Sequence, residues 1–266
     1  MNECTTLHHL QSMKSEGRKI ACLTAYDATT ARMFSEAGVD LLLVGDSLGM
    51  TVQGLPSTTG VTVEQMIYHA RSVRAGSPGA WVMVDMPYLS YADLSTAVDT
   101  ARSLIGEGQG NMVKLEGAGP VVEVVEGLSL RGVPVCAHLG LTPQSVDKLG
   151  GYRVQGRDQD AATRLLVDAR TLEAAGADML VLECVPRQLA AKVSRLLEIP
   201  VIGIGAGPDC DGQVLVWQDM LGFNAQVPRF VRNFADGNRT VKQAVEAYVQ
   251  SVRDGSFPAQ SEWYEG

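Results

Sequence analysis

Short apolar runs alternate along the chain with longer stretches in which apolar residues recur every three or four positions. The short runs predict buried strands and the longer stretches predict amphipathic helices. Strands are expected at Lys19–Tyr26, Asp40–Gly45, Ala80–Asp85, Asn111–Glu116, Val133–His138, Asp178–Glu183 and Pro200–Gly205, with a weaker eighth at Gln213–Gln218. Helices are expected at Ala28–Ala37, Val63–Ala75, Leu94–Gly106, Val121–Arg131, Asp160–Ala175 and Gln188–Leu197.

This alternation predicts an α/β protein with a parallel sheet, because parallel strands need crossover connections. Seven or eight such units in 266 residues favour one (β/α)8 TIM barrel, a fold that typically takes about 250 residues. We expect residues 1–266 to form a single catalytic domain with a short N-terminal helical extension and a C-terminal helix near Val241–Val252, followed by a loose polar tail. An open doubly wound sheet is the structural alternative.

The composition narrows the possible partners and compartment. The chain is 45% hydrophobic and 20% charged, as globular proteins are, and its formal net charge is −8 without a basic run. We therefore expect no nucleic acid and no membrane as partners. The five cysteines form no CxxC pair, which argues against a disulfide framework or a zinc site. Reduced thiols and an N-terminus without a signal-like apolar stretch predict a cytoplasmic protein.

Ionisable side chains stand at the carboxyl ends of five consecutive expected strands, at Asp46, Asp85, Glu116, His138 and Glu183. Any one of them alone could cap the following helix. Five together predict an active site, because catalytic residues of this barrel gather at the carboxyl ends of its strands. Carboxylates that face one cavity repel each other and require a cation. Oxygen ligands from Asp46, Asp85 and Glu116 suit Mg²⁺ or Mn²⁺ better than zinc.

The fourth strand has a directional pattern. Lys114 and Glu116 share one face and Val113 and Leu115 the other, because successive side chains alternate. We expect the apolar pair to contact the helices and the charged pair to point into the barrel near its mouth. There Lys114 could bind an anion, or simply form an internal ion pair with Glu116.

Two further features are less specific. The GIGAG segment, Gly203–Gly207, lacks the GxGxxG spacing and predicts a tight turn at least as well as a phosphate contact. His69 lies within a helical pattern, which favours a structural role over a catalytic one.

Eight long blocks of the sequence follow the order of a known family over nearly the whole chain. They are LTAYD (Leu23–Asp27), VGDSLGMTVQG (Val44–Gly54), VDMPYLSY (Val84–Tyr91), NMVKLEG (Asn111–Gly117), HLGLTPQSV (His138–Val146), GGYRVQGR (Gly150–Arg157), LEAAGADMLVLECVP (Leu172–Pro186) and IPVIGIGAGPDCDGQVLV (Ile199–Val216). They resemble the 3-methyl-2-oxobutanoate hydroxymethyltransferase family, also called ketopantoate hydroxymethyltransferase.

The resemblance implies a Mg²⁺-dependent barrel enzyme of pantothenate biosynthesis. Such an enzyme transfers a hydroxymethyl group from 5,10-methylenetetrahydrofolate to 3-methyl-2-oxobutanoate through a Mg-stabilised enolate and gives 2-dehydropantoate. Relatives form homo-oligomers, commonly decamers, so a homo-oligomer is expected.

The resemblance also implies roles for individual residues. Glu183 would be the general base. The metal ligands would be Asp46, Asp85 and Glu116, and the contacts to the keto acid would come from Asp46, Ser47, Asp85, Lys114 and His138.

The chain departs from the family pattern in four places. LPSTTGVT (Leu55–Thr62) replaces a segment like HDSTLPVT, Gln218 stands where a His is common, Asn224–Val227 replaces a glycine-rich stretch, and Ala137 replaces a Gly. None of these changes removes a proposed metal ligand or the base. The loop at Leu55–Gly60 bears on substrate affinity.

Two other functions remain open from the residues alone. One is a lyase of the phosphoenolpyruvate mutase or isocitrate lyase kind, although the KKCGH-like loop of those enzymes has no equivalent here. The other is a barrel that binds a metabolite without catalysis, against which the intact set of acids argues.

Overall fold

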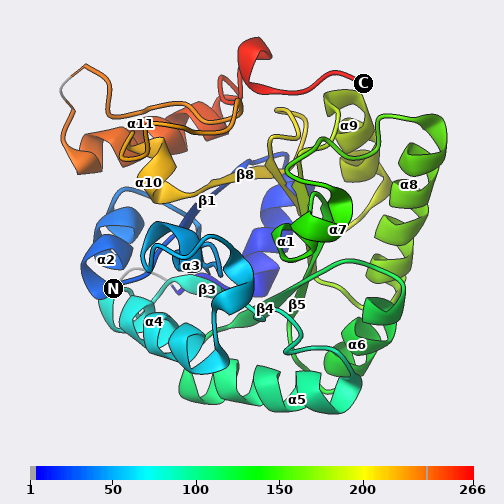
Figure 1. Ribbon diagram of the computed structural model, residues 1–266. Coiled ribbons are helices and arrows are strands. Elements are labelled where there is room, and N and C mark those ends of the chain that lie inside the picture. The colour runs from blue at the N-terminus through cyan, green and yellow to red at the C-terminus, as the bar shows by residue number, and fades with distance from the viewer. Residues whose placement is uncertain (1–3, 238) are drawn as a thin grey trace.

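Eight parallel strands close into a barrel in the computed structural model, which describes residues 4–237 and 239–266 (Figure 1). The strands are β1 (Ile20–Thr24), β2 (Leu41–Val44), β3 (Trp81–Asp85), β4 (Met112–Glu116), β5 (Val135–Gly140), β6 (Met179–Glu183), β7 (Val201–Ile204) and β8 (Gly212–Leu215). Each strand pairs with the next one along the chain, and β8 pairs with β1. The predicted (β/α)8 barrel is therefore confirmed, and the open sheet is wrong.

Helices surround the strands, as Figure 1 shows. The outer ring consists of α2 (Ala28–Glu36), α4 (Val63–Gly76), α5 (Leu94–Arg102), α6 (Pro120–Ser129), α8 (Gln159–Ala174), α9 (Arg187–Leu196) and α11 (Val241–Arg253). The helix expected over Leu94–Gly106 is present as α5 and continues as a π-helix at Ser103–Glu107. The predicted eighth strand was too long, because the strand ends at Leu215 and α10 (Trp217–Met220) follows.

Two apolar layers arise from the alternation of side chains along each strand. On β4, Val113 and Leu115 belong to the layer between strands and helices, whereas Met112 belongs to the layer inside the barrel. Lys114 and Glu116 therefore point inward, as the alternation predicted, and both are buried. The barrel interior is apolar at the amino ends of the strands, here called the lower end, and polar at their carboxyl ends, the mouth of the barrel.

Helix α1 (Leu7–Ser15) closes the lower end of the barrel. Its Leu10 and Met13 pack with the first residues of the strands in the inner apolar layer. Lys14 anchors the helix, because its Nζ lies 2.7 Å from Asp211 Oδ2 and donates to the carbonyl oxygens of Ser194 and Ile199. Among the described residues, the cavity of the barrel therefore opens at the carboxyl ends of the strands.

The polar tail after α11 is ordered by packing, so the prediction of a loose tail was wrong. Phe257 and Trp263 are buried, and Arg187 lies 4.5 Å above the Trp263 ring. Glu262 accepts hydrogen bonds from Arg232 at 2.8 Å through both carboxylate oxygens. The polar composition of this segment did not indicate that its aromatic residues, Phe257 and Trp263, are buried.

All five cysteines are free thiols, and all but Cys4 are buried, in agreement with the prediction from their spacing. None of the described helices has both the length and the apolar character that a membrane span requires.

Candidate active site

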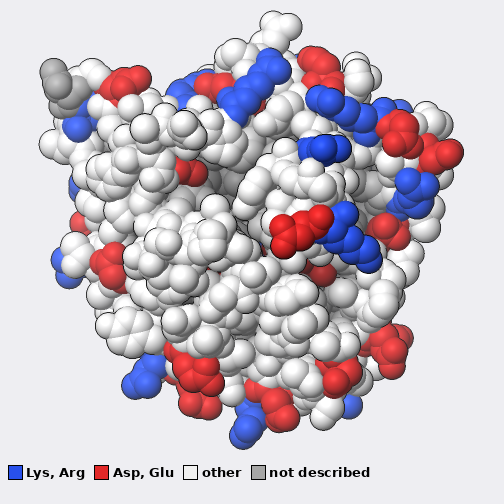
Figure 2. All heavy atoms as spheres, viewed as in Figure 1, with Lys and Arg blue, Asp and Glu red and all other residues white. Residues whose placement is uncertain are grey.

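The strand register places the predicted polar residues side by side at the barrel mouth. Asp85 pairs with Lys114 across β3 and β4, and Glu116 pairs with His138 across β4 and β5. Glu183 follows on β6, opposite Gly140. These side chains line a cavity of about 1170 Å³ together with Asp46 and Ser47. Figure 2 shows a hollow near the middle of this face, with most of the charged side chains farther out.

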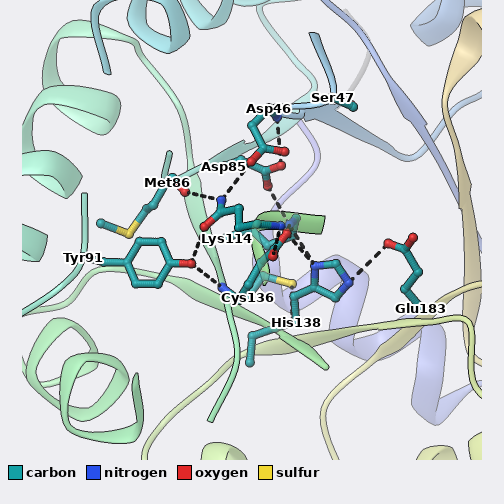
Figure 3. A network of polar contacts seen from close by, with 12 residues as sticks. Asp46, Ser47, Asp85, Met86, Tyr91, Lys114, Cys136, His138 and Glu183 are labelled. Atoms are coloured by element: carbon teal, nitrogen blue, oxygen red, sulfur yellow. Dashed lines mark hydrogen bonds and ion pairs between the residues drawn. The ribbon is translucent and has the colours of Figure 1, made fainter. Parts of the chain in front are cut away.

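The acidic floor of the cavity consists of Asp46, Asp85 and Glu116, and Lys114 lies at its centre (Figure 3). Its Nζ is 2.9 Å from Asp85 Oδ1 and 4.0 Å from Glu116 Oε1. Burial by itself would lower the pKa of this lysine, but the charges of Asp85, Glu116 and Asp46 raise it above its usual value. Lys114 therefore remains an ammonium ion, and it forms the internal ion pair while it also faces the cavity.

Asp46 is bound to its neighbours through both backbone and side chain. Its backbone N–H donates to Asp85 Oδ2 at 3.0 Å, and its Oδ2 accepts from Gln144 Nε2 at 2.8 Å. Burial raises the pKa of Asp46 well above the usual range, and the charges of Asp85 and Glu116 raise it further. The raised pKa indicates that Lys114 alone does not offset the negative charge that Asp46, Asp85 and Glu116 would carry together.

Glu116 has a protein contact on each of its carboxylate oxygens. Oε2 accepts from the backbone N–H of Gln144 at 3.0 Å, and Oε1 lies 3.4 Å from His138 Nδ1. Burial would raise the pKa of Glu116, but the contact with His138 and the charge of Lys114 outweigh it and lower the pKa. Glu116 thus keeps its negative charge more readily than Asp46.

His138 connects the two sides of the site. Its Nδ1 faces Glu116 and lies 3.2 Å from Lys114 Nζ, while its Nε2 lies 3.4 Å from Glu183 Oε2. Burial and Lys114 would lower the pKa of His138, but the carboxylates on its two nitrogens raise it overall. The imidazole therefore lies between the two carboxylates, Glu116 on one side and Glu183 on the other.

The backbone around Glu183 leaves little freedom for this residue. Gly140 has φ +92°, and a Cβ atom there would lie 2.1 Å from the Glu183 carbonyl oxygen. Cys184, which directly follows Glu183, has φ +48°, a backbone conformation that is strained for residues other than glycine. Both features set where the Glu183 carboxylate enters the cavity.

Two functional candidates escaped the sequence interpretation, namely Gln144 and Tyr91. Gln144 also donates to the Met86 carbonyl at 3.0 Å and accepts from Tyr91 Oη at 2.5 Å. Tyr91 Oη in turn accepts from the backbone N–H of Glu116 at 3.3 Å. Gln144 thereby joins Asp46 to Glu116. A neutral amide in a loop carries no strand-end signal, so only its membership of the HLGLTPQSV block could have drawn attention to it.

Gln144→Met tests this connection. It should weaken the binding of Mg²⁺ about tenfold, because Asp46 loses its amide donor while the backbone contact to Glu116 persists. The measurement is a calorimetric titration with Mg²⁺, and Gln53→Met serves as the control on the neighbouring loop. Equal Mg²⁺ affinity in the two variants would show that Gln144 does not position Asp46.

The structure also shows the surroundings of Ser47, His69 and the GIGAG segment. Ser47 Oγ lies 2.9 Å from Tyr26 Oη at the cavity wall. Burial raises the pKa of Tyr26 to about 12, although the hydrogen bond with Ser47 opposes this, so the phenol stays neutral. His69 Nδ1 lies 2.8 Å from the Tyr26 carbonyl oxygen and attaches α4 to the end of β1. In the GIGAG segment Gly205 has φ +63°, as a tight turn requires.

The residues fit a hard cation in part. In the described part of the chain, no three or more histidine, cysteine or carboxylate side chains form a ready metal cage. Asp46 and Asp85 are joined directly by the bond from the Asp46 backbone N–H to Asp85 Oδ2, and this pair could act as direct ligands. Their oxygens retain further lone pairs, and the raised pKa of Asp46 marks a place where added positive charge is stabilising.

Comparison with known proteins decides the family. The family model described as ketopantoate hydroxymethyltransferase matches residues 4–260. This chain belongs to the ketopantoate hydroxymethyltransferase family. The resemblance inferred from the sequence blocks is confirmed, and so is the predicted hydroxymethyltransferase class of enzyme. Family membership also argues against the alternative of a barrel without catalysis.

Two curated relatives in the ketopantoate hydroxymethyltransferase family match nearly end to end. The 3-methyl-2-oxobutanoate hydroxymethyltransferase of Alkalilimnicola ehrlichii is 58% identical over 254 residues, which cover 95% of this chain and 92% of that protein. The enzyme of the same name from Nitrosococcus oceani is 54% identical over 254 residues and covers 95% and 96%, respectively.

Solved structures with the same fold come from another group of enzymes. A 2,3-dimethylmalate lyase of the PEP mutase/isocitrate lyase superfamily has a TM-score of 0.59 at 16% identity and covers 98% of both chains. Phosphonopyruvate hydrolase in complex with oxalate and Mg²⁺ has a TM-score of 0.61 at 10% identity, covering 79% of this chain and 80% of that one. Identities this low show only that the barrel fold is shared. Evidence on the reaction comes from the ketopantoate hydroxymethyltransferase relatives.

Proposed function

We propose that this chain transfers a hydroxymethyl group from 5,10-methylenetetrahydrofolate to 3-methyl-2-oxobutanoate and gives 2-dehydropantoate for pantothenate biosynthesis. The names of the curated relatives support the overall reaction. The observation that carries the chemistry is the cavity floor, where an ammonium ion lies among three buried carboxylates while Glu183 stands on the far side of His138 (Figure 3). Such a site can hold an anionic keto acid and remove a proton from it.

In the proposed reaction, Lys114 and Ser47 hold the substrate carboxylate. Glu183 removes the proton from the carbon next to the ketone, and His138 orients its carboxylate for this step. The enolate carbon then attacks the methylene unit, which the folate presents as an iminium. Overall, one C–H bond of the keto acid and the bonds between the methylene carbon and nitrogen break. One C–C bond forms, and water supplies the hydroxyl group through a new C–O bond. The proton taken by Glu183 and the second proton of water pass to the two folate nitrogens, so tetrahydrofolate leaves.

Asp46 and Asp85 are the proposed ligands of a divalent cation such as Mg²⁺, with Glu116 as a further acid beside them. When bound, such a cation supplies positive charge to the ketone and carboxylate oxygens of the substrate and lowers the energy of the enolate. The complex of phosphonopyruvate hydrolase with oxalate and Mg²⁺ supports a hard cation in proteins of this fold. The protein groups contribute a fixed arrangement of acids.

The test is an assay with 3-methyl-2-oxobutanoate, 5,10-methylenetetrahydrofolate and MgCl₂, in which mass spectrometry detects 2-dehydropantoate. Product should require both organic substrates, disappear with EDTA and return with excess Mg²⁺. Product formation that EDTA leaves unchanged would contradict the metal requirement. Cleavage of a keto acid in the absence of folate would instead favour the lyase alternative. The homo-oligomer and the cytoplasmic location stay predictions, and light scattering of the purified protein tests the former.

A further inference from the structure

The cavity is larger than the proposed keto acid requires. Its volume of about 1170 Å³ lies above the usual range of roughly 300–1,000 Å³ for sites that enclose drug-sized ligands. The keto acid would occupy only the floor, near Lys114 and Glu183. The remaining volume extends outward along the segment Tyr152–Arg157 and the segment Asn224–Pro228 to the rim. A second, longer ligand therefore has room beside the first.

Two arginines line this outer wall, Arg153 and Arg157. Both are exposed, and among the described residues neither guanidinium forms an ion pair or a hydrogen bond. Other arginines nearby are engaged, since Arg187 pairs with Asp209 and Arg232 with Glu262. Arg153 and Arg157 thus present unused charge to the cavity.

The backbone that carries these arginines is fixed even though their side chains are free. The Gln155 backbone N–H donates to the Cys184 carbonyl at 2.8 Å, directly after the proposed base on β6. The Gln155 side chain donates to the Arg153 carbonyl at 3.0 Å. Gly156, with φ +77°, packs against Leu189 of α9. The backbone of Arg153 and Arg157 is therefore held in a defined position on the cavity wall.

Two carboxylates near this wall accept hydrogen bonds from groups other than the two arginines. Asp219 also lines the cavity and accepts from Asn224 at 2.6 Å, while Asp158 caps α8 by accepting from the Ala161 N–H at 2.8 Å. Glu183 faces His138 on the inner side. The cavity thus runs from an acidic floor to a basic rim, although the chain as a whole has a net charge of −8. A ligand that spans it should carry its anionic end outward.

We propose that Arg153 and Arg157 form a carboxylate-binding subsite for the glutamyl tail of the reduced-folate donor. This inference rests on the proposed function, because folate is the donor assumed there. Arginine suits the role, since its planar guanidinium can donate two parallel hydrogen bonds to one carboxylate. With the tail held at the rim, the pterin end of the donor points inward to Glu183 and the keto acid.

The test compares the wild type with Arg153→Gln, Arg157→Gln and the double variant in steady-state assays. The double variant should raise the KM for 5,10-methylenetetrahydrofolate about tenfold, as expected for the loss of charged hydrogen bonds at an exposed site. Its KM for the keto acid and its folate-independent exchange of the keto-acid methine proton should stay at wild-type values. Arg164→Gln, on the exposed side of α8, is the matched control.

A binding measurement keeps the inference testable if the protein proves to use another one-carbon donor. Tetrahydrofolate and the tail-less 6-methyltetrahydropterin are titrated into the wild type and the double variant. The wild type should bind tetrahydrofolate more tightly, and the double variant should lose that difference. Absence of product with the wild type would refute the proposed donor. Equal affinity of wild type and double variant for tetrahydrofolate would refute the subsite, whatever the donor.

Discussion

Glu183→Gln should lower the rate of hydroxymethyl transfer about 10²- to 10⁴-fold, the usual contribution of a positioned general base. An amide of the same shape still fits beside His138 but cannot accept the substrate proton. The most direct measurement is the exchange of the methine proton of 3-methyl-2-oxobutanoate with deuterated water, followed by NMR without folate. In this variant the exchange should stop, because removal of this proton requires the base but not the folate.

Binding measurements separate this effect from damage to the site. Glu183→Gln should keep the wild-type affinity for Mg²⁺, because Asp46 and Asp85 lie on the other side of His138 (Figure 3). Glu126→Gln, on the exposed surface of α6, should leave both exchange and transfer unchanged. Exchange at the wild-type rate in the Glu183 variant would assign the base to another group.

Asp85→Asn should weaken Mg²⁺ binding by roughly a hundredfold or more, because it removes one of the two anionic ligands proposed for a hard cation. It should also remove most of the transfer activity at ordinary Mg²⁺ concentrations. Asp85 has a second role as the ion-pair partner of Lys114 at 2.9 Å. The variant therefore leaves a buried ammonium with weaker compensation, and its melting temperature should fall as well.

The affinity for Mg²⁺ is measured by calorimetry, with the melting temperature followed in parallel. Asp99→Asn on α5 is the control, because this aspartate is exposed and distant from the barrel mouth. Recovery of activity at high Mg²⁺ would support a ligand role for Asp85. If Mg²⁺ bound with wild-type affinity, Asp85 would act only through its ion pair with Lys114.

Much of the site was predictable because strand chemistry is local. The alternation on β4 placed Lys114 and Glu116 inside the barrel, and the structure has them there. The positions of the acids at strand ends predicted their convergence, since all parallel strands of a barrel end on the same face. The role of Glu183 came from family resemblance, because nothing in the spacing of the acids separates it from Glu116.

Other features depend on contacts between distant segments and carry no local signal. Gln144 joins Asp46 to Glu116 only because the loop after β5 folds back over the mouth. Trp263 holds the C-terminal tail through packing and its contact with Arg187, in a segment whose composition suggested a loose end. A hydrophobic pattern cannot reveal such pairings, because it reports which face is buried and not what covers it.

Asp46 and Asp85 show which properties of the site follow from the sequence and which depend on the tertiary structure. The sequence by itself determined that both stand at the ends of buried parallel strands, and hence that they face a common cavity, because burial patterns and strand direction are properties of short segments. Only the tertiary structure decided how their charge is balanced. Lys114 and Gln144 reach them across strand register and loop folding, and the free energy of a buried charge depends on every group around it.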